Sequence, residues 1–408
     1  MGLVSGCSKD SGDGADGKKT TTTAATVTTT KPVPLDDSAS DLELAYLSTD
    51  ASGTTVFLTD GKGSETDVVA KVKGRAEALT WSPDGSKLLL DGDAGTEDFD
   101  LQVVDAETGT VTSLAPSATS NEGGASWSPD GTRVAFFSNR DGGFAGYVVP
   151  VAGGDPVRVT PPEAKGVADL VWSPAGTQLA FSTSAEVNSD VWTVAPDGSN
   201  ARKVSTVPGS TQPRWSPDGK LLAISAQPLG AETSGIFTLD PTTGTSERIA
   251  DTQYHDGFPV WSVDGRSVFF VSAVPNDDAE GGSADDLYRI DVDGGKPEAI
   301  TSDPISIESE LQPSPNGKLI VFSVQRLGDK EVFVANADGT GAIPISRAPE
   351  RSDSWGAWRL PHPRRGRRRR VSRRRPCSTS GGRGRRTPGA AGGSRSAAPC
   401  SRRRPAAG

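Results

Sequence analysis

A five-residue phrase, Trp-Ser-Pro-Asp-Gly, recurs along this chain at nearly constant spacing and constrains its fold more than any other feature. Five good copies begin at Trp81, Trp127, Trp172, Trp215 and Trp261. Ala175 replaces the Asp of the third copy, Val263 replaces the Pro of the fifth, and a weaker sixth copy begins at Pro313. Successive copies lie 46, 45, 43, 46 and 52 residues apart, and a further 45 residues lead to Trp358. Such a period indicates a stacked or circular repeat architecture.

Each copy of the phrase is predicted to form a hairpin turn between two strands. Proline presets φ, Asp bonds to nearby backbone, and Gly accepts the positive φ that returns the chain into a strand. We expect the tryptophans and the turn residues to be structural parts of the repeat, and none of them to be catalytic. These turn residues are Asp84, Gly85, Asp130, Gly131, Gly176, Asp218, Gly219, Asp264 and Gly265.

Each period holds four short strands, which predicts a circular all-β fold. Strands two, three and four occur seven times, and strand one also occurs seven times if residues 354–358 form the last. The simplest closure has this C-terminal strand complete the blade that begins near Leu42. We therefore predict a β-propeller of seven four-stranded blades, with six or eight blades as alternatives.

The repeated phrase and the β-rich strand after it resemble the TolB-like, or WD40-like (PD40), propeller repeat. The resemblance covers roughly residues 40 to 358 and implies a propeller fold. TolB, as a family, is an envelope interaction protein, so the resemblance also implies a place in the cell envelope and a protein or peptide partner. Propellers nevertheless serve as scaffolds, binding domains and enzymes alike.

Charge divides the chain into two unlike parts. Of 43 basic residues, 17 are arginines from Arg359 onward, which leaves 26 basic against 52 acidic side chains before that point. So acidic a body repels polyanions, which argues against nucleic acid as a partner and favours basic proteins or cations, or serves solubility alone. No run of 18 apolar residues is present, so no membrane-spanning helix is expected.

The N-terminus resembles the end of a bacterial lipoprotein signal. Val4-Ser5-Gly6-Cys7 is similar to a lipobox, and residues 9–31 read as a flexible Ser, Thr and Gly tether. We expect Cys7 to be lipidated and the chain to be anchored on the outer face of the cytoplasmic membrane, with secretion as the alternative. A complete signal would start further upstream than Met1. The opposing interpretation is a chance cysteine in a cytoplasmic N-terminus.

The C-terminal part has a different composition, with arginine clusters among Pro, Gly, Ala and Ser. We interpret it as a frameshifted product, because it begins directly after Trp358, where a further Ser-Pro-Asp-Gly is due. The alternative is a genuine polybasic tail that binds membrane lipid or an anionic wall polymer. The expected organisation is a signal remnant and linker over residues 1–34, a propeller over 35–358 and a disordered tail over 359–408.

The body offers little recognisable chemistry. Its single histidine, His255, neighbours Asp256, a thin basis for a catalytic or metal site. The acidic stretches 91–100 and 276–286 lack the spacing of a known calcium loop. No catalytic residue, metal or cofactor is therefore assigned.

The sequence leaves three functions open. The leading hypothesis is a non-catalytic, monomeric envelope propeller that binds a protein or peptide through the loops between strands two and three and between blades. The second is the propeller of a prolyl-oligopeptidase-like serine peptidase whose hydrolase domain is missing. The third is a propeller that binds or cleaves a carbohydrate, which an inner lining of aromatic and carboxylate side chains would favour.

Overall fold

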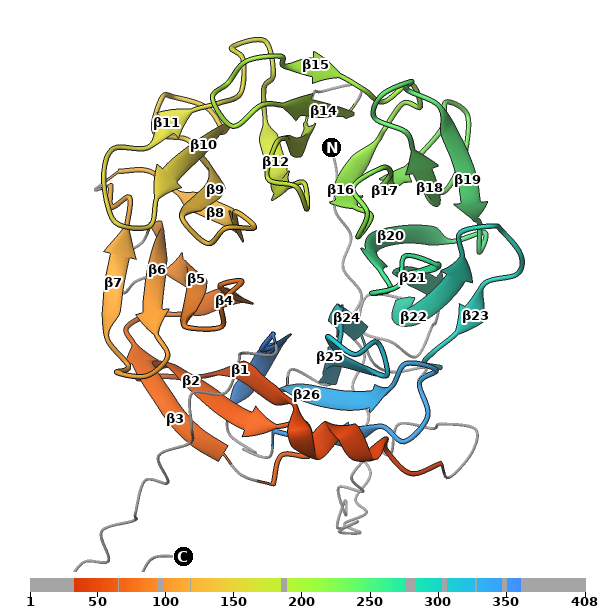
Figure 1. The fold of residues 1–408 in the computed structure, drawn as a ribbon. Helices are drawn as coiled ribbons and strands as arrows, with labels where there is room; N and C mark the ends of the chain where they lie inside the picture. Colours follow the sequence, from red (N-terminus) through yellow and green to blue (C-terminus); the bar gives the residue numbers. More distant parts are fainter. Residues whose placement is uncertain are drawn as a thin grey trace, which may run out of the picture. The chain divides into compact units, whose positions relative to one another are not determined.

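A computed structural model describes residues 33–64, 66–93, 98–117, 119–184, 189–275, 283–302, 307–326, 329–346 and 351–360 of the chain. The side chains of residues 283, 307–309, 326 and 329 are not described. Cys7 and residues 361–408 lie outside these ranges. Seven blades of four strands are arranged around a common axis, with the first strand of each blade innermost (Figure 1). Five of the blades are separate sheets, and a parallel bridge between Asp285 and Ile307 joins the other two into one eight-stranded sheet. The predicted seven-bladed all-β fold is thus confirmed.

The first four blades take their strands from the N-terminal half of the body, except for β28, which comes from its C-terminal end. Blade one contains β28 (Ser352–Trp358), β1 (Glu43–Asp50), β2 (Gly53–Asp60) and β3 (Thr66–Val72). Blade two contains β4 (Ala76–Trp81), β5 (Lys87–Asp93), β6 (Phe99–Asp105) and β7 (Val111–Leu114). Blade three contains β8 (Glu122–Trp127), β9 (Arg133–Ser138), β10 (Ala145–Pro150) and β11 (Val157–Arg158). Blade four contains β12 (Val167–Trp172), β13 (Leu179–Thr183), β14 (Asp190–Val194) and β15 (Arg202–Lys203).

The remaining three blades follow in chain order. Blade five contains β16 (Thr211–Trp215), β17 (Leu222–Ala226), β18 (Gly235–Leu239) and β19 (Ser246–Ala250). Blade six contains β20 (His255–Trp261), β21 (Ser267–Pro275), β22 (Ser283–Asp291) and β23 (Glu298–Ala299). Blade seven contains β24 (Ile307–Pro313), β25 (Leu319–Arg326), β26 (Asp329–Asn336) and β27 (Ile343–Pro344). A short 3-10 helix, η1 (Asp37–Asp41), precedes β1.

The ring is closed by its C-terminal strand, as the repeat count predicts. β28 pairs antiparallel with β1, with Leu44 opposite Trp358 and Ser48 opposite Asp353. It thereby takes the innermost place in a blade whose other three strands come from the N-terminal side of the body. Closure of this kind joins the two ends of the ring without leaving an open interface between them.

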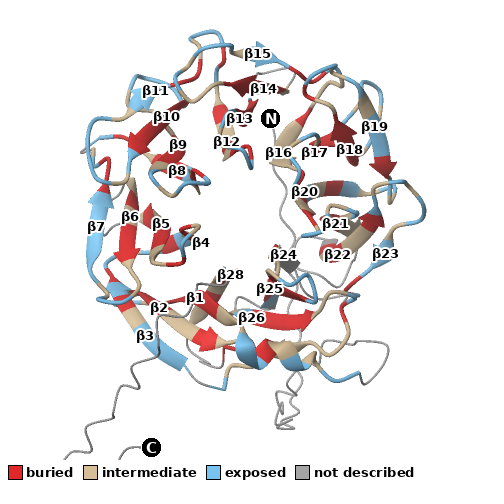
Figure 2. Cartoon of the chain, in the orientation of Figure 1, coloured by how far each residue is buried: buried red, intermediate tan, exposed pale blue. Residues whose placement is uncertain are grey.

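Burial follows the layers of each blade. The second and third strands are mostly buried, whereas exposed residues concentrate on the outermost strands and the turns (Figure 2). The fully buried side chains are largely Leu, Ile, Val and Phe of facing blades, which pack into clusters between neighbouring sheets. The fourth strands of blades three, four, six and seven have only two residues each, so the outer edge offers little unpaired backbone.

The repeat tryptophans connect successive blades through hydrogen bonds. In four of them the indole Nε1–H donates to a backbone carbonyl of the preceding blade, at 2.9 to 3.3 Å. The pairs are Trp81 with Ala357, Trp127 with Thr80, Trp261 with Arg214, and Trp358 with Gln312. Each acceptor directly precedes the tryptophan position of its own blade. The bond from Trp81 to Ala357 spans the closure.

The Ser-Pro-Asp-Gly turns are held by their own side chains. In the first copy the Ser82 hydroxyl donates to Asp84 at 2.6 Å and accepts from the Lys87 amide at 2.9 Å. Gly85 has a φ of +65°, the left-handed conformation that favours glycine. The turn hydrogen bonds keep the pKa of the equivalent carboxyls Asp130 and Asp218 at about 2, the Ser128 or Ser216 hydroxyl being the largest cause in each case.

Arg359, which the sequence places at the start of the tail, packs against the first blades. Its amide donates to the Glu43 carbonyl, and its guanidinium binds the Glu43 carboxylate at 2.7 Å and the Gly85 carbonyl at 2.8 Å. The same guanidinium lies 4.9 Å from the centre of the Trp81 ring. Arg359 therefore covers a repeat tryptophan at the point where the ring closes.

Replacing Trp261 by Phe should destabilise the ring more than the same change at Trp172. The two indoles are similarly buried, but only Trp261 donates to a carbonyl of the preceding blade, whereas Trp172 Nε1 has no hydrogen-bond partner among the described residues. The Arg133 guanidinium lies over the Trp172 ring, and a phenylalanine there still offers it a ring face. The lost bond is worth about 1 kcal/mol in the free energy of unfolding. Urea denaturation of both variants measures the difference, and equal losses would contradict a role for this bond in joining the blades.

Candidate functional site

Six of the seven innermost strands contain a residue in the left-handed conformation, three positions before the tryptophan position. Five of them are not glycine, and their φ values lie between 50° and 59°. The residues are Gly124, Asp169, Gln212, Phe258, Glu310 and Trp355. The register of each innermost strand shifts at the same place, so these residues form β-bulges. Left-handed non-glycine residues cost free energy and concentrate at functional sites.

These bulges, here named the bulge ring, are linked from blade to blade. Gln212 Oε1 accepts from the Phe258 amide of the next blade at 2.7 Å, and Glu310 Oε2 accepts from the Trp355 amide at 2.9 Å. A bulged residue leaves the regular hydrogen-bond ladder, so its amide needs another acceptor. The side chain of one bulge therefore stabilises the strained backbone of the next.

Two carboxylates of the bulge ring are paired with cations. Asp169 accepts from the Ser182 hydroxyl at 3.0 Å and lies 3.7 Å from the Arg214 guanidinium. Glu310 accepts from the Ser323 hydroxyl at 2.6 Å and forms an ion pair with Lys330. The bulge ring thus presents fixed donors and acceptors of both charges, an arrangement suited to recognising polar groups.

Apolar side chains are exposed at the same end of the propeller. The bulges precede the Trp turns, so they lie toward the start of strand one, the end at which strand two connects to strand three. We name this the 2–3 end. Phe258 is 62% exposed there, and the connections between strands two and three carry Leu229, 91% exposed, and Phe144, 39% exposed. Trp355 is partly exposed. Exposed aromatic residues of this kind are typical of interaction sites.

The residues singled out in the sequence occupy other places. The repeat tryptophans and turns lie at the opposite end of the blades, where successive turns are close together: a Cβ added to Gly131 would lie 3.5 Å from Pro83 Cδ of the preceding turn. His255 is exposed, whereas its neighbour Asp256 is buried and accepts from Thr252. Successive strand residues point to opposite faces, so this pair does not act together.

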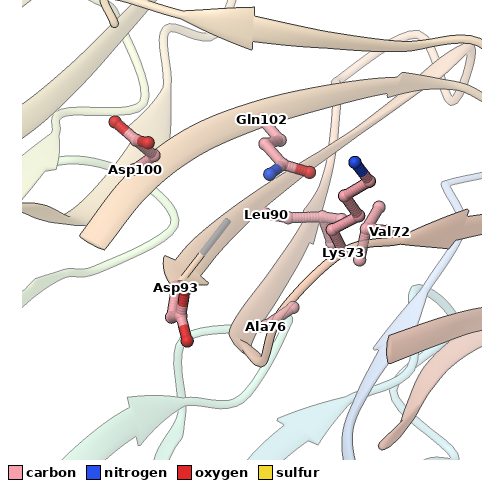
Figure 3. A pocket seen from close by; sticks show the side chains of 8 residues that line it. Val72, Lys73, Ala76, Leu90, Asp93, Asp100 and Gln102 are labelled. Carbon is pink, nitrogen blue, oxygen red and sulfur yellow. The ribbon is translucent and has the colours of Figure 1, made fainter. Parts of the chain in front are cut away.

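Parts of both acidic stretches, residues 94–97 and 276–282, lie outside the described residues. Over the described ranges, no group of three or more His, Cys, Asp or Glu side chains is placed to hold a metal ion. Asp100 and Gln102 of β6 line a small cavity of about 10 Å³ together with Lys73 and Leu90 (Figure 3). That volume suits a single water molecule and is too small for an organic ligand.

The bulge ring was missed in the sequence because its residues share no side-chain type. Asp, Gln, Phe, Glu and Trp follow one another at equivalent positions. The available signal is positional: counting back three residues from each Trp of the phrase gives the bulge in all but blade two, where the register shift lies between Ala76 and Ala78.

No helix in the described part of the propeller is both long enough and apolar enough to cross a membrane.

The Asp91 carboxyl gives the bulge ring a pH dependence. Burial raises the pKa of Asp91 from 3.8 to about 6, against the hydrogen bond that its Oδ2 accepts from the Gly124 amide at 2.9 Å. Because the folded-state pKa is raised, the contribution of Asp91 to stability is greatest below about pH 4 and is lost as the pH rises through 6.

Changing Asp91→Asn should therefore remove this loss while an amide oxygen still accepts from Gly124. The variant should gain stability over the parent between pH 4 and 7, by at most about 3 kcal/mol. Chemical denaturation at pH 4, 5, 6 and 7 measures the gain. A difference between the two proteins that stays constant across this range would contradict the raised pKa.

Comparison with known proteins gives relatives for part of the chain. The "Uncharacterized peptidase YuxL" of Bacillus subtilis (strain 168) is 28% identical over 130 residues, 32% of this chain and 19% of that protein. The "Uncharacterized protein Atu1656" of Agrobacterium fabrum is 28% identical over 148 residues, 36% of this chain and 45% of that protein. The chain thus spans less than half the length of these curated relatives.

Solved structures share the fold at low identity. TolB from Acinetobacter baumannii matches 79% of this chain and 67% of its own, with a TM-score of 0.51 and 17% identity. A structure from a study of two prolyl endopeptidases matches 76% of this chain and 48% of its own, with a TM-score of 0.57 and 12% identity. An oligogalacturonate lyase in complex with manganese matches 78% of this chain and 85% of its own, with a TM-score of 0.52 and 17% identity. At such identities the likeness concerns the fold alone.

The family model described as the TolB beta propeller domain, PD40, matches residues 13–205 and 167–354. These matches cover most of the chain and include the repeated turns and every residue of the bulge ring except Trp355. The chain therefore belongs to the TolB beta propeller domain (PD40) family.

Proposed function

We propose that the chain is a non-catalytic cell-envelope propeller that binds a protein or peptide partner at its 2–3 end. The observation that best supports this proposal is the environment of Phe258. Its aromatic side chain is 62% exposed, and its backbone has a φ of 53°. Stability alone does not explain this residue, because exposure forgoes burial and the left-handed conformation costs about 1 kcal/mol or more. An exposed aromatic on a fixed backbone is a low-entropy anchor for a partner.

The surroundings of Phe258 support the same proposal. Its amide is fixed by Gln212, and the exposed Leu229 belongs to the adjacent blade at the same end. The body carries 52 acidic against 26 basic side chains, which favours a partner with a basic surface around an apolar centre. Family membership and the similarity to TolB from Acinetobacter baumannii are consistent with an envelope protein.

Anchoring through Cys7 belongs to the proposal as well. A diacylglycerol on this cysteine holds the propeller at the outer face of the cytoplasmic membrane, with the tether of residues 9–31 between lipid and blades. Palmitate labelling of the parent and of Cys7→Ala tests it. Label and membrane association should both be lost in the variant, and unchanged association would count against the anchor.

Position 258 should be in contact with the partner in cells. A photoreactive benzoylphenylalanine there should cross-link to a discrete protein species. Val157 is the matched control, because it is 58% exposed but lies on the outer strand β11. Comparable products from positions 258 and 157, or none from either, would contradict binding at the 2–3 end.

The Phe258→Gly variant should separate stability from binding. Glycine relieves the left-handed strain, and little burial is lost. The free energy of unfolding of the variant should therefore be higher than that of the parent by about 0.5 kcal/mol or more. When the photoreactive residue is placed at a position next to 258, the yield of the cross-linked partner should be lower in the Phe258→Gly variant than in the parent. A destabilised variant would show that the Phe258 ring contributes to packing instead.

A carbohydrate ligand is the second candidate, because the bulge ring contains two aromatics, Phe258 and Trp355, and two carboxylates, Asp169 and Glu310. Both carboxylates are paired with cations, which favours binding over acid–base chemistry. Titration with acidic and neutral oligosaccharides distinguishes this function: saturable binding that Phe258→Gly abolishes would favour it over a protein partner.

The match to the YuxL peptidase favours a third candidate, the propeller of a serine peptidase. Sequencing of the locus downstream of the codon for Trp358 tests it. A shifted frame that encodes Gly-x-Ser-x-Gly within a hydrolase-like segment would favour the peptidase, and an intact frame in related strains would favour the basic tail as it stands.

A further inference from the structure

Trp215 differs from the other repeat tryptophans in its environment. Trp81, Trp127, Trp172, Trp261 and Trp358 are all between 5% and 9% exposed. Trp215 is only partly buried and lines an open groove of about 540 Å³ between blades four and five. Gln178 of blade four and Asp218, Lys220 and Asp240 of blade five line the same groove, and Lys220 is paired with Asp218 at 3.0 Å.

The difference originates in the residue that the preceding blade places over each tryptophan. Arg133 opens β9, and its guanidinium lies 4.7 Å from the centre of the Trp172 ring. Its carbonyl accepts from the Ser128 amide of its own turn. In blade four the carbonyl of Gln178 accepts from the Ser173 amide in the same way, so Gln178 is the equivalent residue. Trp215 therefore faces an uncharged amide where Trp172 faces a cation.

Blade one shows that this position can be filled by a cation from elsewhere in the chain. In blade one the equivalent of Arg133 and Gln178 is Glu43, whose carbonyl accepts from the Arg359 amide. The Glu43 carboxylate binds the Arg359 guanidinium, which lies 4.9 Å from the centre of the Trp81 ring. The same protein thus places an arginine on a repeat tryptophan twice, once from the blade itself and once through a carboxylate. A stacked guanidinium group is attracted electrostatically both to the face of the ring and to a nearby carboxylate.

Of the two carboxylates in the Trp215 groove, Asp218 is paired with Lys220, so a further cation would face Asp240. Asp240 begins the turn between strands three and four, and its equivalent in blade two, Asp105, lies 3.5 Å from Lys87 Nζ. Blade five has Leu221 at the position of Lys87. The Oδ1 atom of Asp240 accepts from the Thr242 and Thr243 amides, and no ion pair to Asp240 occurs among the described residues. Hydrogen bonds lower the pKa of Asp240, and the largest cause is the bond from the Thr242 amide. The carboxyl is therefore ionised at neutral pH.

We propose that the groove between blades four and five binds an arginine side chain of a partner protein. The guanidinium stacks on Trp215 and faces Asp240, in the position that Arg133 and Arg359 occupy over Trp172 and Trp81. The groove lies among the turns at the end opposite to the 2–3 end, so this site is independent of the one proposed for Phe258. An arginine-bearing partner also matches the acidic body, with its 52 carboxylates against 26 cations.

Fluorine NMR of the full chain labelled with 5-fluorotryptophan tests the site directly. The protein has 8 tryptophans, and Trp215→Phe identifies the resonance of residue 215. The probes are acetyl-Gly-Arg-Gly-Arg-Gly-amide and the same peptide with citrulline, which has the shape of arginine without its charge. The arginine peptide should shift the Trp215 resonance in a saturable way, with an affinity at least about fivefold above that of the citrulline peptide.

Three variants separate the site from a general charge effect. Gln178→Arg places the chain's own guanidinium over Trp215, so it should abolish the response and raise the thermal unfolding midpoint. Asp240→Asn should weaken peptide binding several-fold. Gln227→Arg adds the same charge on an exposed connection between strands two and three, at the far end of the blade, and should leave the response unchanged.

The remaining outcomes contradict the proposal. Equal shifts with the arginine and citrulline peptides, or no shift of Trp215 at saturating arginine peptide, would show that the groove does not select a cation. A Trp215 resonance that moves when all arginines from Arg364 onward are replaced by glutamine would show that the chain's own tail occupies the groove. In that case a partner's arginine is not the occupant.

Discussion

The packing of apolar side chains between neighbouring blades is the interaction on which the ring depends, and at four of the seven interfaces a hydrogen bond from an indole to a carbonyl of the preceding blade reinforces it. A propeller has no central core, so each blade gains stability only from its two neighbours. The bond from Trp81 to Ala357 extends this linkage across the closure and ties the C-terminal strand to blade two. Strand β28 therefore completes a blade and also joins the two ends of the body.

The fold could be predicted from the sequence because its strongest signals are local. Proline, Asp and Gly in a fixed order determine a turn without help from distant residues, and the constant interval between copies gives the blade. Closure by residues near Trp358 followed from counting strands. Arg359 was assigned to the tail on composition, since nothing in its neighbours reveals that Glu43 and Trp81 hold it.

The candidate site could not be predicted in the same way. A bulge is imposed by the pairing of two strands and by the fit of one blade against the next, so it leaves no preferred residue type. Gln212 and Glu310 look like ordinary strand residues until the structure places them against the amides of Phe258 and Trp355. The groove at Trp215 depends on which residue the preceding blade places over the tryptophan, Gln178 in this case, and this is visible only when the equivalent residues of the other blades are compared.

The two ends of the blades thus perform different tasks. At one end, repeated turns of nearly identical sequence lie close together, and the indole hydrogen bonds join successive blades there. At the other, equivalent backbone positions carry different side chains, so a regular scaffold presents an irregular surface. This division is possible only if the innermost strands are rigid, because strained bulges persist where the surroundings determine them.

Native-state hydrogen exchange of the Trp355 amide tests this account most directly. The amide lies in the closing strand, in a left-handed residue, and its acceptor is Glu310 of the neighbouring blade. If closure holds the bulges rigid, it should exchange only when the whole propeller unfolds, with the same opening free energy as the central strands. Exchange within minutes, while the amides of β2 stay protected, would show that the closing strand opens by itself and that the ring does not hold its inner surface fixed.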